Sequence, residues 1–146
     1  MDSVVQELDN ILKKYSSKRV VVLGTTCCGK STYLQSIPYA VDMDEIVFPL
    51  LSQEESDYVC QTPWTLEIGE TMIRLTKERV KIEPGKPVFG TVLLDADLIV
   101  YLDISDKVLK QRCNKRNVNY EDAKNMQKSI EEEIQESEIE CVKIKI

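Results

Sequence analysis

The sequence predicts a single-domain α/β protein in which a parallel sheet of about five strands lies between two layers of helices. Short apolar runs alternate along the chain with segments of helical periodicity, and this alternation implies crossover connections between parallel strands. The chain has 146 residues, of which 42% are hydrophobic and 30% are charged, and this suits one core of ordinary size. It contains no internal repeat, low-complexity segment or linker, so residues 1–146 are expected to form one domain.

The first part of the chain predicts a helix, a strand and a second helix. Apolar residues recur at helical spacing over residues 3–15, and Ser3 stands in the position of an N-cap. Residues 19–23 form an uninterrupted β-branched run, as in a central parallel strand that is covered on both faces. A short helix is expected over residues 30–37, because Pro38 ends the pattern.

The middle of the chain is less regular. Residues 39–41 predict a short strand at the edge of the sheet, whereas residues 45–63 have a mixed pattern and predict no clear element. Helical periodicity returns over residues 66–81. Turn-forming residues at 83–87 then precede a strand that is expected over residues 88–94.

The last part of the chain predicts two further strands and two helices. An apolar run predicts a strand over residues 98–102. Ser105 is expected to cap a helix over residues 106–116, which has acidic residues early and basic residues late. A final helix over residues 119–137 and an alternating strand over residues 140–146 complete the pattern.

The overall charge excludes some classes of partner. The formal net charge is −6, and an acidic surface repels the phosphate backbone, so no nucleic-acid partner is expected. No apolar run is long enough to span a membrane, and the acidic, amphipathic N-terminus differs from a signal peptide. A cytoplasmic protein is therefore expected.

The additional N-terminal helix, residues 1–17, could pack on its own sheet or against a second copy in a homodimer.

The cysteines and the absence of histidine narrow the chemistry. There are five cysteines and no C-x-x-C pair, which predicts reduced thiols in place of a disulfide framework or a zinc site. There is no histidine, so a general base must be a carboxylate, a lysine, a cysteine or water. The same absence excludes a Ser-His-Asp hydrolase.

One motif carries a specific chemical prediction. Residues 24–31, GTTCCGKS, match the phosphate-binding pattern G-x-x-x-x-G-K-[ST] and lie between a predicted strand and a predicted helix. In such a loop, backbone amides surround the phosphates, the lysine reaches the β- and γ-oxygens and the serine holds Mg²⁺. The residues expected to contact a nucleotide here are Gly24, Thr25, Thr26, Cys27, Cys28, Gly29, Lys30, Ser31 and Thr32. The alternative is a glycine-rich turn that is packed for its own sake.

Cys27 and Cys28 occupy the variable positions of this motif, where a steric role is expected. A thiol at a helix N-terminus can also be acidified, so sensitivity to oxidation is the alternative. A GTPase is not indicated, because the chain lacks both the guanine-reading N/T-K-x-D motif and the D-x-x-G switch.

The order of the motifs resembles that of small P-loop kinases, above all shikimate kinases and adenylate and nucleoside kinase-like proteins. The resemblance rests on the glycine loop, on D-x-D at residues 42–44, on DLIVYLD at residues 97–103 and on two arginines, Arg112 and Arg116. It implies a P-loop nucleoside triphosphate hydrolase fold with strand order 2-3-1-4-5 and ATP on the loop. By the same resemblance, Asp42 helps to hold Mg²⁺ and Asp44 holds the hydroxyl group of the acceptor. Both acids could equally be polar residues at the end of a strand.

The resemblance also implies a lid. Arg112 and Arg116 lie one helical turn apart, and in the family such arginines cover the adenine and neutralise the phosphate that is transferred. Only a minimal lid, residues 112–120, fits between the last two predicted helices. A solvated basic helix end is the alternative.

Three further positions have both a functional and a structural interpretation. Gly69-Glu70 and Arg74 resemble the substrate-binding helix of shikimate kinases, but Arg74 could also be a solvated helix charge. Gly90-Thr91 could form an acceptor-binding turn, or Gly90 could admit a close neighbour within a strand. Asp95 could be the acidic residue that follows a buried strand in ATPases, or it could form a turn together with Asp97.

The expected function is Mg²⁺-dependent transfer of the γ-phosphate of ATP to a small hydroxyl or phosphate acceptor. In this interpretation Lys30, Asp42, Asp44 and Arg112 are the catalytic residues, and Ser31 and Asp42 hold the metal. The alternative is a regulatory or scaffold module that binds a nucleotide and has no kinase activity.

Overall fold

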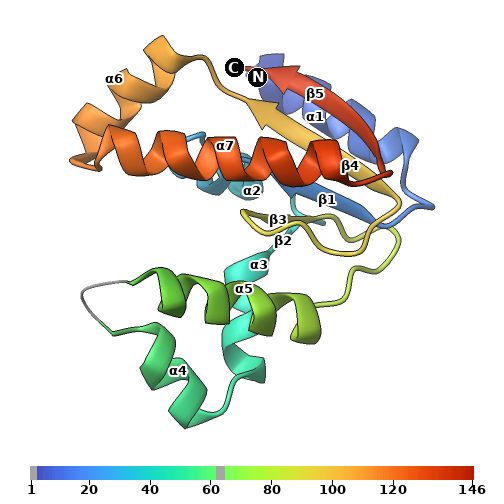
Figure 1. Ribbon diagram of the computed structural model, residues 1–146. Coiled ribbons are helices and arrows are strands. Elements are labelled where there is room, and N and C mark those ends of the chain that lie inside the picture. Colours follow the sequence, from blue (N-terminus) through green and yellow to red (C-terminus); the bar gives the residue numbers. More distant parts are fainter. Residues whose placement is uncertain (1–2, 62–64) are drawn as a thin grey trace.

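The computed structural model describes residues 3–61 and 65–146 and contains a five-stranded, all-parallel sheet (Figure 1). The strand order is β2-β3-β1-β4-β5, which confirms the predicted α/β class and sheet topology. The strands are β1 (Val20–Leu23), β2 (Val41–Asp42), β3 (Val88–Gly90), β4 (Leu98–Asp103) and β5 (Glu140–Lys145). Because all five strands run the same way, the segments that follow β1, β2 and β3 meet at one edge of the sheet.

Helices cover both faces of the sheet. They are α1 (Ser3–Lys14), α2 (Lys30–Ser36), α3 (Met43–Val47), η1 (Phe48–Leu50, a 3₁₀ helix), α4 (Gln53–Val59), α5 (Leu66–Arg79), α6 (Asp106–Arg116) and α7 (Tyr120–Glu136). Ser3 is the first described residue and already belongs to α1, so the structure does not show it as an N-cap. Among these described helices, none combines the length and the apolar character that crossing a lipid bilayer requires.

The core has two main parts, one on each face of the sheet. One part contains side chains of α1, α2 and α6 against β1, β4 and β5. The other contains side chains of α3 and α7 against β1, β3 and β4. Leu8 of α1 is fully buried in the first part, so the N-terminal helix packs on its own sheet.

The expected strand over residues 88–94 is too long, because β3 ends at Gly90. Val92 and Leu94 are buried and Leu93 between them is less so, which gives this segment the alternation of a strand although no strand pairs with it. The neighbouring β2 pairs with β3 only at Val41 and Asp42. The edge strand was expected over residues 39–41, whereas the structure places it at Val41 and Asp42.

Asp95 and Asp97 lie where the strands of the sheet begin, whereas the glycine loop lies where they end. The guanidinium group of Arg19, just before β1, donates to Asp95 Oδ2 at 3.0 Å and to Asp97 Oδ1 at 3.0 Å. The backbone of Arg19 also exchanges hydrogen bonds with Asp97, and the arginine holds the pKa of that carboxyl group below its usual value. These contacts fix the connection between β3 and β4, so the turn interpretation of this pair of acids is correct.

The segment that gave no clear prediction folds into α3, η1 and α4, which lie with α5 beyond the β2 edge of the sheet (Figure 1). Ser52 and Glu55 form a capping box at the start of α4. The corresponding S-x-x-E pattern is present in the sequence and is typical of a helix N-terminus. Glu55 also accepts hydrogen bonds from Arg79 of α5 at 3.1 and 2.9 Å. Residues 62–64, at the end of this segment, lie outside the described residues.

The Glu55–Arg79 pair predicts how the packing of α4 on α5 depends on pH. Hydrogen bonds from Arg79 lower the pKa of Glu55 from 4.5 to about 2. Ionised Glu55 therefore stabilises the fold above about pH 4.5, and this contribution is lost as the pH falls toward about 2. We expect urea unfolding midpoints of wild type and Glu55→Gln to differ most near neutral pH and to converge on acidification. The control is Glu54→Gln on the same helical turn, and an equal pH dependence in both variants would contradict the prediction.

Candidate functional site

The glycine loop, residues 24–29, leaves β1 through a position where a side chain has no room. A Cβ atom at Gly24 would lie 2.5 Å from Cys28 Sγ and 3.2 Å from Leu102 Cβ. The thiol of Cys28 is fully buried in this position. The first glycine of the motif is therefore required by close packing inside the loop itself.

Two residues give the loop its curvature. Cys27 has φ 67° and Gly29 has φ 101°, so both lie in the left-handed region. For a residue with a side chain such as Cys27, this conformation costs about 1–2 kcal/mol. The surrounding contacts must therefore hold the loop in this shape.

Lys30 supplies part of that support. Its ammonium group donates to the backbone carbonyl oxygens of Gly24, at 2.6 Å, and of Thr25, at 2.8 Å. Lys30, the first residue of α2, thus binds the two residues at the start of the loop. The ammonium group also approaches Cys28 Sγ at 3.6 Å, and none of these three acceptors is a carboxylate that would neutralise its charge.

A buried hydrogen bond joins the loop to α7. Thr25 Oγ1 donates to the carbonyl oxygen of Ala123 at 2.6 Å, and both residues are fully buried. Cys27 is buried beside Cys113 of α6, whose pKa is raised by burial and then by this neighbouring thiol. The loop is therefore anchored to both of the last two helices, which supports the expected steric role of its cysteines.

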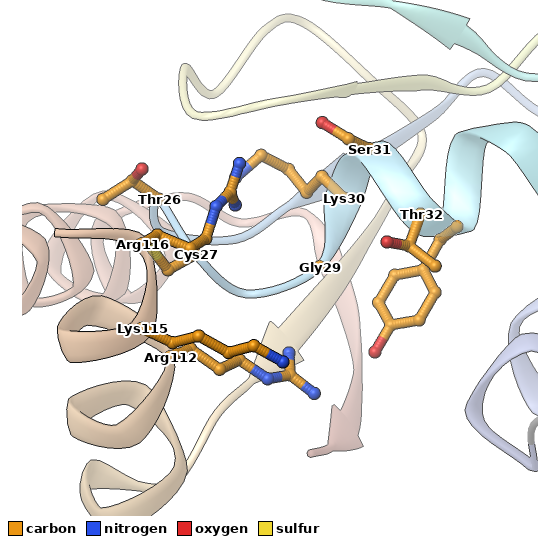
Figure 2. Close-up of a pocket in the computed structure, with 10 residues that line it drawn as sticks. Thr26, Cys27, Gly29, Lys30, Ser31, Thr32, Arg112, Lys115 and Arg116 are labelled. Carbon is orange, nitrogen blue, oxygen red and sulfur yellow. The ribbon is translucent and has the colours of Figure 1, made fainter. Parts of the chain in front are cut away.

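Helix α6 brings further positive charge to the loop (Figure 2). Arg112 Nη1 donates to the carbonyl oxygen of Cys28 at 2.9 Å and lies 3.2 Å from the position of a Cβ atom at Gly29. Lys115 extends beside Arg112 from the same helix (Figure 2). Asn117, with φ 57°, ends α6, so the residues expected to form a lid are the last turn of α6, a short connection and the start of α7.

These residues line a pocket of about 660 Å³. The lining residues are Thr26, Cys27, Gly29, Lys30, Ser31, Thr32, Tyr33, Arg112, Lys115 and Arg116. Four of them are cationic and none is acidic, although the whole chain carries a net charge of −6. The pocket therefore suits a ligand with several negative charges.

The pocket includes most of the expected loop residues but not all. Gly24, Thr25 and Cys28 lie behind it, where their carbonyl oxygens bind Lys30 and Arg112. Tyr33 and Lys115 were not expected. Lys115 could have been found, because the spacing of residues 112, 115 and 116 places three bases on one helical face.

Asp42 and Asp44 lie at the same edge of the sheet but do not line the pocket. Asp42 ends β2 and caps α3, because its Oδ1 accepts from the backbone N–H of Asp44 at 3.0 Å. The pKa of Asp44 is raised, first by desolvation and then by repulsion from Asp42, while attraction to Lys30 acts in the opposite direction. The carboxyl group of Asp44 is thus close enough to Lys30 for the two charges to interact.

Two of the open alternatives are settled by contacts. A Cβ atom at Gly90 would lie 2.6 Å from Met43 Sδ, so this glycine admits a close neighbour within the core. The side chain of Arg74 is 60% exposed, approaches Glu78 at 3.5 Å and lines neither the cationic pocket nor a second pocket between α5 and α7, so it is a solvated helix charge. Gly69, Glu70 and Thr91 line a second pocket.

No cluster of three or more acidic, cysteine or histidine side chains capable of holding a metal occurs within residues 3–61 and 65–146. A Mg²⁺ ion that arrives with a nucleotide does not need such a cluster, since phosphates and water supply most of its ligands. Ser31 lines the cationic pocket and is exposed, so its hydroxyl group is accessible to such an ion.

No protein-family model matches this chain, and a search of curated proteins found no match. Taken together, the strained loop, its lysine and the bases of α6 form a site that can bind a polyanion.

The packing at Gly24 predicts a specific coupling. We expect Gly24→Ala to lower the free energy of unfolding by about 1–3 kcal/mol, because the new methyl group overlaps Cys28 Sγ. Cys28→Ala should rescue much of that loss in the double variant, since it removes the overlapping atom. Urea unfolding of the four proteins of this double-mutant cycle measures the coupling. Strictly additive effects would show that the two residues do not constrain each other.

Proposed function

We propose that the chain is a phosphotransferase that binds the phosphates of a nucleoside triphosphate, such as ATP, in the cationic pocket and passes the γ-phosphoryl group to a small acceptor. The observation that carries this proposal is the gathering of Lys30, Arg112, Lys115 and Arg116 around a G-x-x-x-x-G-K-[ST] loop on an acidic protein. Positive charge concentrated in one pocket against the net charge of the chain favours a phosphate ligand over a neutral one.

The roles of the residues follow from what the transfer requires. The acceptor oxygen forms a bond to the γ-phosphorus, the bond to the bridging oxygen of the departing diphosphate breaks, and the proton of the hydroxyl group passes to a carboxylate or to water. Charge on the transferred group is stabilised by cations that are already in place, which suits Lys30 and Arg112. Ser31 and Asp42 would hold Mg²⁺, which neutralises phosphate charge when bound.

Asp44 is the residue best suited to orient the acceptor. It lies at the carboxyl edge of the parallel strands, where ligands of open α/β sheets bind, and it senses the charge of Lys30. In a chain without histidine, a carboxylate with a raised pKa is also a suitable proton acceptor. A cytoplasmic location fits as well, because all five cysteines are free thiols.

A nucleotide-binding module without transfer activity is the second candidate, and two contacts favour it. Asp42 is used as the cap of α3, and Arg74 pairs with Glu78 on the surface. Asp42 thus has a role within the fold and Arg74 is a solvated charge, as would also be found in a module that has lost its acceptor site.

The first test is nucleotide binding by variants of the cationic pocket. We expect Lys30→Ala and Arg112→Ala each to weaken ATP binding about 10- to 150-fold, as for the loss of a charged hydrogen bond worth about 1.5–3 kcal/mol. Turnover should fall further than binding in Lys30→Ala. Titration calorimetry with ATP and Mg²⁺ measures the binding. Lys110→Ala is the matched control, since it removes an exposed positive charge from α6 outside the pocket. Absence of ATP binding to the wild type, or equal effects in all three variants, would contradict the proposal.

The second test uses the pH dependence of transfer. Because the pKa of Asp44 is raised above 3.8 and the ionised carboxylate is the active form, kcat should rise with pH through that elevated pKa. Asp44→Asn should abolish this rise and lower kcat by about 10²- to 10⁴-fold. ADP release at saturating ATP, measured across the acidic range, gives the profile. Glu45→Gln, an exposed neighbour on α3, should retain the wild-type profile, and an unchanged profile in Asp44→Asn would assign this acid a structural role.

A further inference from the structure

The cationic pocket and the second pocket carry opposite charges. The second pocket, here called the acidic groove, has a volume of about 540 Å³ and lies between α5 and α7. Glu70, Asp122 and Glu133 line it together with apolar side chains such as Ile73 and Met126, and none of its described lining residues is basic. An anionic chain is therefore repelled by the groove and attracted to the bases that α6 brings to the glycine loop.

We propose that the cationic pocket selects its ligand by the length of a phosphate chain and does not distinguish between bases. Inorganic tripolyphosphate and nucleoside triphosphates of any base are then ligands of the same site, and Lys115 and Arg116 are phosphate-binding residues. The inference rests on the proposed function, because it names the class of donor that the same pocket takes. Three observations carry it: the unpaired bases of α6, the directions of their side chains, and the composition of the pocket lining.

Lys115 and Arg116 have no acidic partner. With the other residues of 3–61 and 65–146, neither forms an ion pair or a hydrogen bond, although the chain has more acidic than basic residues. Together with Arg112 they lie within two turns on one side of α6, where like charges repel one another. A bound anion removes this repulsion, so the arrangement favours a ligand that contacts all three bases.

The side chains of these bases reach different sides of the pocket. In Figure 2, Arg112 and Lys115 extend in the same direction from α6, whereas Arg116 points toward the side of the pocket that Thr26 and Lys30 line. A chain of three phosphates can meet positive charge along its whole length in such a pocket. A single phosphate can contact only part of the set, so affinity should depend on the number of phosphates.

The lining of the pocket contains few groups that could distinguish one base from another. Bases are read by hydrogen bonds to their edges, commonly from amide and carboxylate side chains, and they stack on aromatic rings. The described lining residues include no Asn, Gln, Asp or Glu. Tyr33 is the one aromatic residue among them, and it is 3% exposed, with ring atoms 3.2 Å from the position of a Cβ atom at Gly29. Stacking on an arginine would accept every base, because every base has a π-face.

The first measurement compares ligands on the wild-type chain by titration calorimetry, at one free Mg²⁺ concentration and one ionic strength. We expect ATP, GTP and CTP to bind within about 3-fold of one another, and inorganic tripolyphosphate to bind within about 10-fold of ATP, or about 1.4 kcal/mol. Tripolyphosphate should displace ATP competitively. Pyrophosphate should bind at least about 10-fold more weakly than tripolyphosphate, because it contacts fewer of the bases. Adenosine, which has no phosphate, should give no heat.

The second measurement removes the two unpaired bases. In Lys115→Gln/Arg116→Gln, we expect ATP and tripolyphosphate binding to weaken by the same factor, about 3- to 30-fold, as for the loss of two exposed charge contacts. The control Lys107→Gln/Lys110→Gln makes the same change in net charge at exposed positions of α6 outside the pocket. It should change neither affinity by more than about 2-fold, because exposed charges at a distance are screened.

The possible results separate this inference from the proposed function. A preference of more than about 10-fold for ATP over GTP, CTP or tripolyphosphate would overturn the inference and leave the proposed function standing. A loss confined to ATP in Lys115→Gln/Arg116→Gln would also overturn it, since the two bases would then contact the nucleoside. Binding of all four triphosphates without phosphoryl transfer to any acceptor would support the inference and overturn the proposed transfer. Absence of heat with every phosphate compound would overturn both.

Discussion

The shape of the glycine loop depends on Lys30, whose ammonium group is bonded to the carbonyl oxygens of Gly24 and Thr25. The loop contains a non-glycine residue with positive φ at Cys27, so it is not the conformation that an isolated chain would prefer. The lysine, the packed thiol of Cys28 and the buried bond from Thr25 to Ala123 offset this cost together. A bound anion would interact with the same ammonium group, so the contact that shapes the loop also connects loop shape to ligand binding.

The molecule separates its stabilising contacts from its candidate site. At the amino edge of the sheet, Arg19 pairs with Asp95 and Asp97 and closes the connection between β3 and β4. At the carboxyl edge, the residues of α6 converge on the loop and leave positive charge exposed. Bases that were fully paired could not bind a ligand, so the acids that would neutralise them are placed elsewhere.

Charge is also divided within the carboxyl edge. The pocket at the loop has only positive charges among its lining residues, and the acidic groove has only negative ones. The first turn of α7 lies between them, with Ala123 bonded to the loop and Asp122 facing the groove.

The sequence by itself determined the α/β class, the positions of most strands and helices, and the loop with its lysine. It could do so because strand and helix periodicity and the G-x-x-x-x-G-K-[ST] spacing are local properties of the chain. It could not determine where the strand after residue 88 ends, since Val92 and Leu94 alternate like strand residues and only the lack of a neighbouring strand decides otherwise. Nor could it separate the roles of Asp95, Gly90 and Arg74, because each depends on a partner distant in sequence or on which surfaces form a pocket. The acidic groove exists only where α5 and α7 approach each other, so tertiary packing alone placed its charges and apolar side chains together.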